Sequence, residues 1–114
     1  MTEQELACAY VRAFSEGDLD GLAAVLTEDF CIRGPLYTFT DRAAFLQRLR
    51  ELNAPKAAFD IVHCQGGNNS ASVFFHYRLG ALELLMAMHL QIRDGRISEA
   101  LLVFDTARLP GRRD

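Results

Sequence analysis

Residues 70–92 read SASVFFHYRLGALELLMAMHLQI, and this stretch decides the fold. On both sides of Gly80-Ala81 the apolar side chains recur with the period of two that is typical of β-strands. A tight turn at Gly80-Ala81 places Arg78 opposite Glu83, a cross-strand pair of opposite charge. The same register aligns three apolar pairs on one face: Tyr77 with Leu84, Phe75 with Met86, and Val73 with Met88. We therefore predict an antiparallel hairpin with one apolar face.

The period of two continues in both directions and covers residues 57–105. Four strands are predicted there, at residues 57–65, 70–79, 82–92 and 97–105. Turn residues separate them, namely Gly66-Gly67-Asn68-Asn69, then Gly80, then Asp94-Gly95. Before residue 57 the apolar period is 3.6, which indicates helices. Helices followed by a meander of strands are typical of an α+β domain.

Two helices are predicted in the first part of the chain. Thr2 and Glu5 form a capping box that starts the first helix, and Gly17 ends it. The second helix begins near Asp18 and is expected to break at residues 27–29.

A short strand and a third helix follow. The strand covers residues 30–32 and stops at Gly34-Pro35. The third helix starts at Thr40 or Asp41 and is closed by Asn53-Ala54-Pro55. Its predicted core positions are Phe45, Leu46, Leu49 and Leu52.

Length and composition indicate one acidic domain over residues 1–107 with a solvated basic tail at 108–114. The 114-residue chain has 12 Lys and Arg against 15 Asp and Glu, a net charge of −3. It lacks the positive surface of a nucleic-acid binder. No apolar run approaches the roughly 20 residues of a membrane span. We expect a cytoplasmic protein that binds neither nucleic acid nor membrane.

The cysteines Cys8, Cys31 and Cys64 are odd in number and show no CxxC spacing. This pattern predicts neither a disulfide framework nor a zinc site. We expect small buried hydrophobes in a reducing compartment, and no metal or cofactor.

The register of the strand at 57–65 decides where its polar residues point. If Asp60 lies opposite His76 on the outer face, then Phe59, Ile61 and His63 face inwards. An inward His63 is a candidate general acid or base.

The last strand leaves two registers open for Glu99. If Asp94-Gly95 makes a simple two-residue turn, Glu99 faces the core and is a candidate acid or base. If a bulge shifts the register by one residue, Glu99 is solvated. The inward sets are Ile97, Leu101 and Val103 in the first case, and Ala100, Leu102 and Phe104 in the second. We favour the second register because all of its inward-facing side chains are apolar.

Residues 10–22, YVRAFSEGDLDGL, resemble the opening of ketosteroid-isomerase-like proteins. Residues 94–97, DGRI, running into 103–105, VFD, are similar to the last hairpin of the same proteins. They belong to the nuclear transport factor 2-like superfamily, which includes the SnoaL-like polyketide cyclases. The resemblance implies a cone-shaped α+β barrel with one pocket, usually a homodimer through the outer sheet face. In this chain, that face would carry His76, Phe74, Leu85, Ala87, His89 and Gln91.

The resemblance carries over only one of three catalytic groups of the isomerase. The oxyanion-hole tyrosine of its first helix matches Tyr10. The catalytic aspartate before a proline is replaced by Gly34, and the aspartic acid before a histidine is replaced by Met88. A proton shift beside a carbonyl needs a base and a polarised oxyanion hole, so activity by that mechanism is not expected.

We expect an apolar pocket between helices and sheet that binds a small apolar or aromatic molecule, with weak acid/base chemistry as an extension. Its predicted wall comprises Tyr10, Phe14, Ile32, Tyr37, Phe59, His63, Tyr77, Met86 and Met88. Tyr10, His63 and Glu99 are the candidate catalytic residues. The alternative is a non-catalytic homodimeric binding module of the same fold. Epoxide hydrolysis, which in this family uses an inward arginine between two aspartates, has no matching set here.

Overall fold

The computed structural model describes residues 1–52 and 57–109. In chain order its elements are α1 (Glu3–Glu16), α2 (Leu19–Val25), β1 (Leu26–Arg33), β2 (Thr38–Phe39), α3 (Arg42–Leu52), β3 (Ala58–Gly67), β4 (Ser70–Leu79), β5 (Leu82–Arg93), β6 (Arg96–Val103) and the 3-10 helix η1 (Thr106–Arg108). The strands form a six-stranded sheet in the order β2-β1-β6-β5-β4-β3. β1 and β6 run parallel, and the other neighbouring strands run antiparallel.

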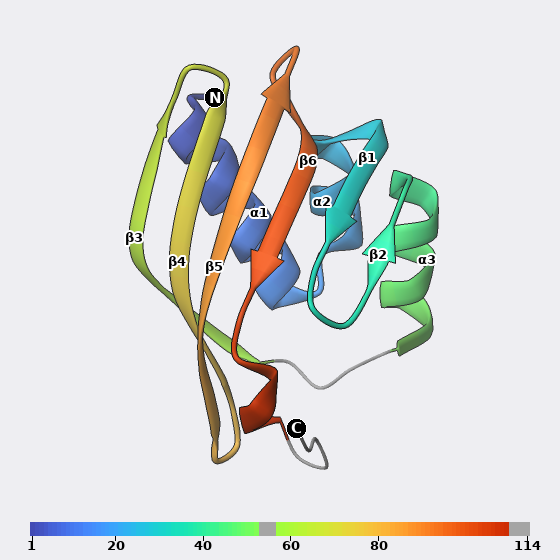
Figure 1. Cartoon of the computed structure of the whole chain (residues 1–114). Coiled ribbons are helices and arrows are strands. Elements are labelled where there is room, and N and C mark those ends of the chain that lie inside the picture. Colours follow the sequence, from blue (N-terminus) through green and yellow to red (C-terminus); the bar gives the residue numbers. More distant parts are fainter. Residues whose placement is uncertain (53–56, 110–114) are drawn as a thin grey trace.

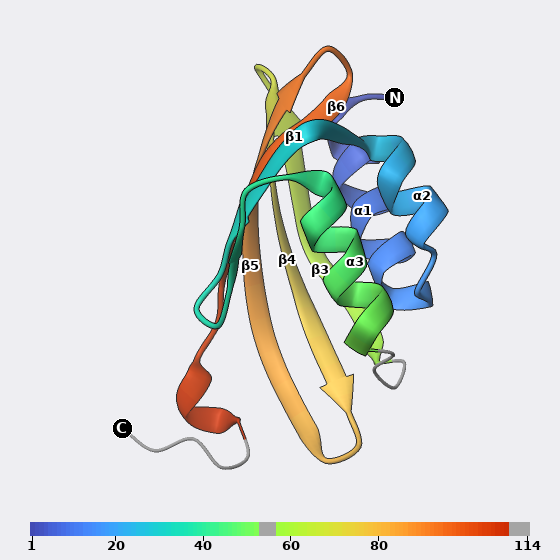
Figure 2. The same cartoon turned by 90° about the vertical axis from the view of Figure 1, so that its right-hand side faces the viewer.

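The sheet is curved, and α1, α2 and α3 all lie on its concave side (Figures 1 and 2). The convex face carries none of these three helices, as the edge view in Figure 2 shows. The predicted fold class, with N-terminal helices packed on a curved and mainly antiparallel sheet, is confirmed.

Side-chain caps define where the helices begin and end. Thr2 and Glu5 form the predicted capping box, which also lowers the pKa of the Glu5 carboxyl. Gly17 ends α1 in the left-handed conformation, with a φ of 71° that favours glycine. Asp18 and Asp41 each accept a hydrogen bond from the backbone N–H three residues later, at 2.9 and 2.7 Å. These caps fall at the predicted helix starts.

Strand β1 is longer than predicted. Residues 27–29, expected to be a break, lie inside it, and α2 runs directly into it at Leu26. The reason is pairing with a distant strand: Leu26 lies opposite Ile97, and Ile32 lies opposite Ala100. Pairing with residues far away in the sequence can turn a polar segment into a strand, and local β-propensity does not predict such pairing.

The register predicted for the β4–β5 hairpin is confirmed, from Arg78 opposite Glu83 to Val73 opposite Met88. The preceding turn is shorter than predicted. Gly66 and Gly67 pair with β4 and belong to β3, so the turn consists of the two residues Asn68-Asn69. Their φ values of 54° and 62° are those of the tight turn that suits the twist of a hairpin.

Two bulges decide the polar registers that the sequence left uncertain. In β3 the register shifts between Ile61 and His63, so that His63 lies opposite Phe74 on the convex face. The prediction of an inward His63 is therefore wrong. In β6, Glu99 pairs with Gln91 after a shift, which confirms the favoured register and leaves the Glu99 side chain exposed.

The core lies between the three helices and the concave face. Its largest fully buried side chains include Tyr10, Phe30, Phe45 and Phe75. Leu52 is 50 % exposed, so its prediction as a core residue is wrong. It is the last residue of α3, and the buried end of this helix is at Phe45.

Beyond η1, Leu109 packs against the core. Residues 110–114 of the predicted tail and the predicted helix stop at 53–55 lie outside the described residues. No helix within residues 1–52 and 57–109 is long and apolar enough to cross a membrane.

Candidate ligand-binding site

An aromatic cluster lies between the helices and the concave face of the sheet. Phe14 on α1 is at its centre, with its ring centroid 6.2 Å from that of Tyr10, 6.4 Å from Phe45 and 5.7 Å from Phe59. Centroid distances of 4.5–7 Å are typical of favourable aromatic pairs. The cluster continues to Phe75 and Tyr77 on β4, to Phe30 on β1, and to Phe39 and Tyr37. The cone interior is thus largely lined by rings.

The Tyr10 hydroxyl is the unusual polar group in this cluster. The side chain is 1 % exposed, and its hydroxyl has no hydrogen-bond partner in the described part of the chain. A buried hydroxyl without a partner costs about 1–3 kcal/mol. Burial, followed by the charge of the Tyr37 phenol, holds the pKa of Tyr10 well above its ordinary value. Tyr10 is therefore a neutral phenol whose O–H donor has no partner among the described residues.

Tyr37 provides a second phenol in the same region. It packs on Phe39 with ring centroids 5.4 Å apart, and burial raises its pKa. Its backbone oxygen accepts from the N–H of Gly34 at 2.9 Å. A side chain on Gly34 would start 3.7 Å from Leu102 Cβ and 3.8 Å from the Tyr37 ring. Gly34 thus borders the interior where the isomerase carries its base, and it offers no titratable group.

The second replaced position is also inside. Met88 lies opposite Val73 and Leu102 on the concave face and is buried. In the described residues, Thr27 is the one polar side chain classed as buried beside the apolar core, and no Asp, Glu, Lys, Arg or His is buried. The interior therefore offers hydrogen-bond donation and apolar contact, with no buried carboxylate or imidazole to move a proton.

Eight of the nine predicted wall residues lie in the core or pack against it. These are Tyr10, Phe14, Ile32, Tyr37, Phe59, Tyr77, Met86 and Met88. The ninth, His63, is on the convex face, as is the candidate Glu99. Of the three candidate catalytic residues, the structure places only Tyr10 inside. The β3 bulge that turns His63 outwards leaves no signal in the strand pattern, whereas the β6 shift gives the register that the apolar pattern favoured for Glu99.

A groove that the sequence did not predict lies between α1 and β3. It encloses about 360 Å³ and is lined by Cys8, Val11, Arg12, Ser15, Glu16, Phe59, Asp60 and Ile61. Phe59 belongs both to this groove and to the aromatic cluster. The Tyr10 hydroxyl itself is closed off from solvent and does not line this groove. The spacing of Cys8, Arg12 and Ser15 indicates one helix face, but its partner strand was not predictable.

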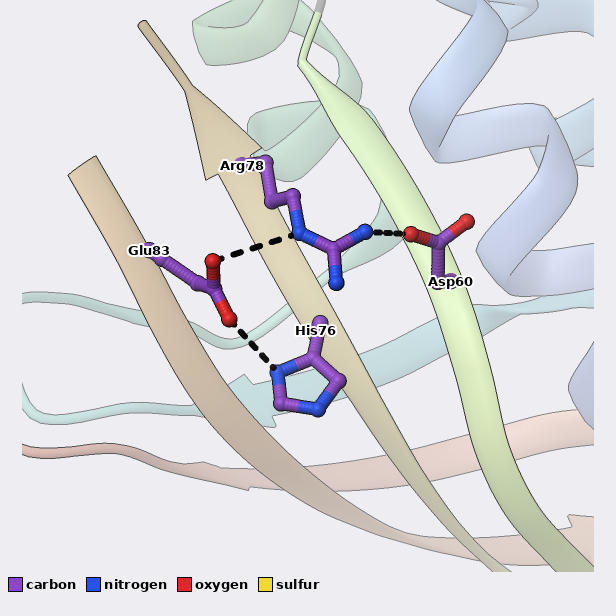
Figure 3. A network of polar contacts seen from close by, with 4 residues as sticks. All are labelled: Asp60, His76, Arg78 and Glu83. Atoms are coloured by element: carbon purple, nitrogen blue, oxygen red, sulfur yellow. Dashed lines mark hydrogen bonds and ion pairs between the residues drawn. The ribbon is translucent and has the colours of Figure 1, made fainter. Parts of the chain in front are cut away.

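An arginine between two carboxylates is present, but on the wrong face for pocket chemistry. Arg78 bonds Asp60 and lies 3.4 Å from Glu83, which in turn lies 3.7 Å from His76 (Figure 3). These side chains project from β3, β4 and β5 on the convex face and are substantially exposed. Exposed ion pairs of this kind contribute about 0–1 kcal/mol to stability.

All three histidines lie on the convex face, because the β3 bulge brings His63 to the side of His76 and His89. His89 contacts Ser72 and Gln91 at 3.2 Å each. A second hollow of about 190 Å³ lies beside it, lined by Cys31, Arg33, His89, Gln91, Glu99, Ala100 and Leu101. Over residues 1–52 and 57–109, no group of three or more His, Cys, Asp and Glu side chains is arranged to hold a metal ion.

The fold and the interior together define a cone-shaped α+β protein with an aromatic core and a buried phenol. Comparison with protein families agrees: residues 7–100 match the SnoaL-like domain. The chain belongs to this family. A comparison with curated proteins gives no match.

Solved structures of the same fold carry different functional descriptions. A candidate ketosteroid isomerase from Kribbella flavida DSM 17836 is 24 % identical, with a TM-score of 0.82 over 97 % of this chain and 83 % of the other. An LEH-like epoxide hydrolase from M. tuberculosis is 16 % identical, with a TM-score of 0.80 over 93 % and 84 %. A candidate SnoaL-like polyketide cyclase from Shewanella denitrificans OS-217 is 17 % identical, with a TM-score of 0.76 over 90 % of each chain. At these identities the likeness establishes the fold alone.

Proposed function

We propose that the protein binds a small, uncharged, apolar or aromatic molecule that carries an oxygen acceptor for the Tyr10 hydroxyl. The unpaired Tyr10 hydroxyl inside the aromatic cluster is the observation that carries the proposal. A ligand carbonyl would satisfy a donor that the folded chain leaves unsatisfied. The rings around it would supply the apolar contact.

The proposal is for binding without proton-transfer catalysis. Gly34 and Met88 provide no base and no second acidic donor at the positions that the isomerase uses. Of the three groups that the isomerase uses, the chain keeps the phenol donor of Tyr10. This donor can orient a carbonyl but cannot take a proton from the carbon beside it.

Entry of a ligand requires side chains to move, because the Tyr10 hydroxyl is closed off in the structure. Met86 and Met88 lie on the concave face that bounds this interior. Methionine is unbranched and flexible, and it adapts its shape more readily than other core side chains. We therefore expect the two methionines to report on ligand binding.

The test uses protein labelled with ¹³C at the methionine methyl groups. Acetophenone is the probe, and ethylbenzene is its matched partner without the carbonyl oxygen. Acetophenone should shift the signals of Met86 and Met88 but leave that of Met1, which is 79 % exposed. It should bind roughly fivefold more tightly than ethylbenzene, because one hydrogen bond contributes about 1 kcal/mol.

The Tyr10→Phe variant is the control for this experiment. It should no longer prefer acetophenone to ethylbenzene, because the donor for the carbonyl oxygen has been removed. Unchanged Met86 and Met88 signals with either probe at millimolar concentration would contradict the binding proposal. A preference for acetophenone that persists in Tyr10→Phe would contradict the role of the hydroxyl.

We further propose that the convex face joins two copies of the chain into a homodimer. Leu85 and Val103 are 57 % and 52 % exposed there, and Phe74 and Leu101 are also exposed. Pairing across β4, β5 and β6 gathers these side chains on one face, which α1, α2 and α3 leave uncovered (Figure 2). Contiguous exposed apolar surface of this kind marks an interaction site.

Light scattering after gel filtration tests this proposal. The natural chain should have the mass of a dimer, and the double variant Leu85→Lys/Val103→Lys should have the mass of a monomer, because lysines would be buried in the interface. Leu52→Lys is the matched control, since Leu52 is equally exposed but lies on α3. A natural chain that is monomeric at 100 µM, roughly the concentration at which a weak association is populated, overturns the dimer.

A further inference from the structure

The first half of α1 and the last half of β3 lie unusually close together. A Cβ placed on Gly66 would be 2.7 Å from the backbone nitrogen of Gln4 and 2.9 Å from Glu3 Cβ. Only glycine leaves room for this approach. The N–H of Asn69 also donates to Glu3 Oε2 at 3.2 Å. The edge strand is therefore held directly against the helix.

Two cysteines lie in this contact region between α1 and β3, which we call the α1–β3 seam. The bulge in β3 that turns His63 outwards places Cys64 opposite Val73, on the side of the helices. The Cys64 thiol donates to the Gln4 carbonyl oxygen, with 3.8 Å between sulfur and oxygen. Cys8 lies one helical turn after Gln4 on the face of α1 that borders β3. It is near enough to Cys64 to raise the pKa of the Cys64 thiol. Two closely packed backbones that each carry a cysteine at the contact are the arrangement that a disulfide requires.

The two sulfurs differ in their surroundings. Burial, followed by the neighbouring Cys8, raises the pKa of the Cys64 thiol to about 11. Cys64 is therefore protonated and a poor nucleophile at neutral pH. Cys8 lines the α1–β3 groove of about 360 Å³, through which a small solute can reach its sulfur. All three cysteines are half-buried, whereas core positions were expected.

We propose that Cys8 and Cys64 are an oxidisable dithiol that hydrogen peroxide converts into a disulfide between α1 and β3. The Cys8 thiolate attacks one peroxide oxygen, the O–O bond breaks, and Cys8 becomes a sulfenic acid. The departing hydroxide takes up the proton that the Cys8 thiol gave up and leaves as the first water. The Cys64 sulfur then attacks the Cys8 sulfur. The S–S bond forms, the S–O bond breaks, and the second water leaves with the Cys64 proton. Two thiols lose two electrons and two protons, and the peroxide is reduced to water.

The remaining cysteine provides an internal comparison. Cys31 lies on β1 opposite Glu99, on the convex side of the sheet. It does not share the α1–β3 seam. The cross-link should therefore form within one chain and exclude Cys31.

The test treats the full chain with hydrogen peroxide, blocks the remaining thiols with N-ethylmaleimide, and digests it with trypsin. Cleavage after Arg12, Arg33, Lys56 and Arg78 separates the cysteines into the peptides 1–12, 13–33 and 57–78. We expect peptide 1–12 linked to peptide 57–78, released again by dithiothreitol, and maleimide on peptide 13–33. Oxidation should raise the melting temperature by on the order of 10 °C, because the cross-link closes a long loop.

Three variants complete the design. Cys31→Ser should oxidise as the natural chain does. Cys8→Ser should give no linked peptides, and Cys64→Ser should leave a sulfenic acid on Cys8 that dimedone traps. Three maleimide-labelled peptides after peroxide treatment, or links through Cys31 or between two chains, would overturn the proposal. Folding of each variant is checked by circular dichroism, and the natural chain alone already distinguishes these outcomes.

Discussion

Replacing Phe45 by alanine is expected to lower the free energy of unfolding by about 3–5 kcal/mol, the range for removing a buried aromatic side chain. Phe45 is 1 % exposed, and its ring contacts those of Phe14, Phe30 and Phe39. It is also the fully buried residue of α3. Its loss removes both its own burial and the main attachment of α3 to the sheet. Urea unfolding followed by circular dichroism measures the change.

The matched control is Leu52→Ala on the same helix. Leu52 is half exposed, so its truncation should change stability by less than about 0.5 kcal/mol. If both variants lost the same free energy of unfolding, Leu52 would be as buried as Phe45. That result would support the core face predicted from the sequence and contradict the exposed position of Leu52.

Local patterns were sufficient to predict the elements that depend on their neighbours in sequence. The β4–β5 register follows from one tight turn and one alternating pattern, and it is correct at every predicted pair. The start of α1 follows from two residues three positions apart. The residues of a capping box or a tight turn determine the local backbone conformation, so these elements can be predicted without knowing the rest of the fold.

The misplaced residues depend on partners far away in the chain. A bulge adds one residue to a strand without changing its composition, so the strand pattern alone could not place His63. Likewise, residues 27–29 lie within β1 because Leu26 and Cys31, on either side of them, pair with β6 in parallel. The proximity of Cys8 and Cys64 was not predictable either. It depends on the β3 bulge and on the close approach of α1 and β3 at Gly66.

The candidate site was predictable in its apolar wall and in Tyr10, because inward positions on helices and strands follow from periodicity. The missing hydrogen-bond partner of the Tyr10 hydroxyl was not predictable. Whether a tyrosine hydroxyl finds a backbone partner depends on atoms within about 3 Å, which no sequence pattern specifies. The structure leaves this hydroxyl unpaired in the described residues, and that makes the role of Tyr10 testable through stability as well as binding.

Tyr10→Phe is expected to stabilise the protein by about 1–3 kcal/mol, because it removes a buried hydroxyl that has no partner. The ring and its contacts with Phe14 and Phe30 remain. A tyrosine with a satisfied hydroxyl would show the opposite sign, a loss of about 0.5–1.5 kcal/mol. Tyr77→Phe is the control, since Tyr77 is only half-buried and should respond little. Urea unfolding at pH 7 gives the sign directly.

The pH dependence provides an independent check of the same hydroxyl. The pKa of Tyr10 is raised in the folded state, so the unfolded chain releases this proton first as the pH rises past 10.0. Stability is therefore full below that pH and falls above it, by about 1.4 kcal/mol per pH unit for each proton concerned. Tyr37 and Cys64, whose pKa values are also raised, contribute losses of the same sign. The advantage of Tyr10→Phe over the natural chain should consequently be constant up to about pH 9 and grow above pH 10. If the stability difference between Tyr10→Phe and the natural chain stayed constant above pH 10, the Tyr10 hydroxyl would have the same pKa in the folded and unfolded chains. That result would contradict the burial of this hydroxyl away from water.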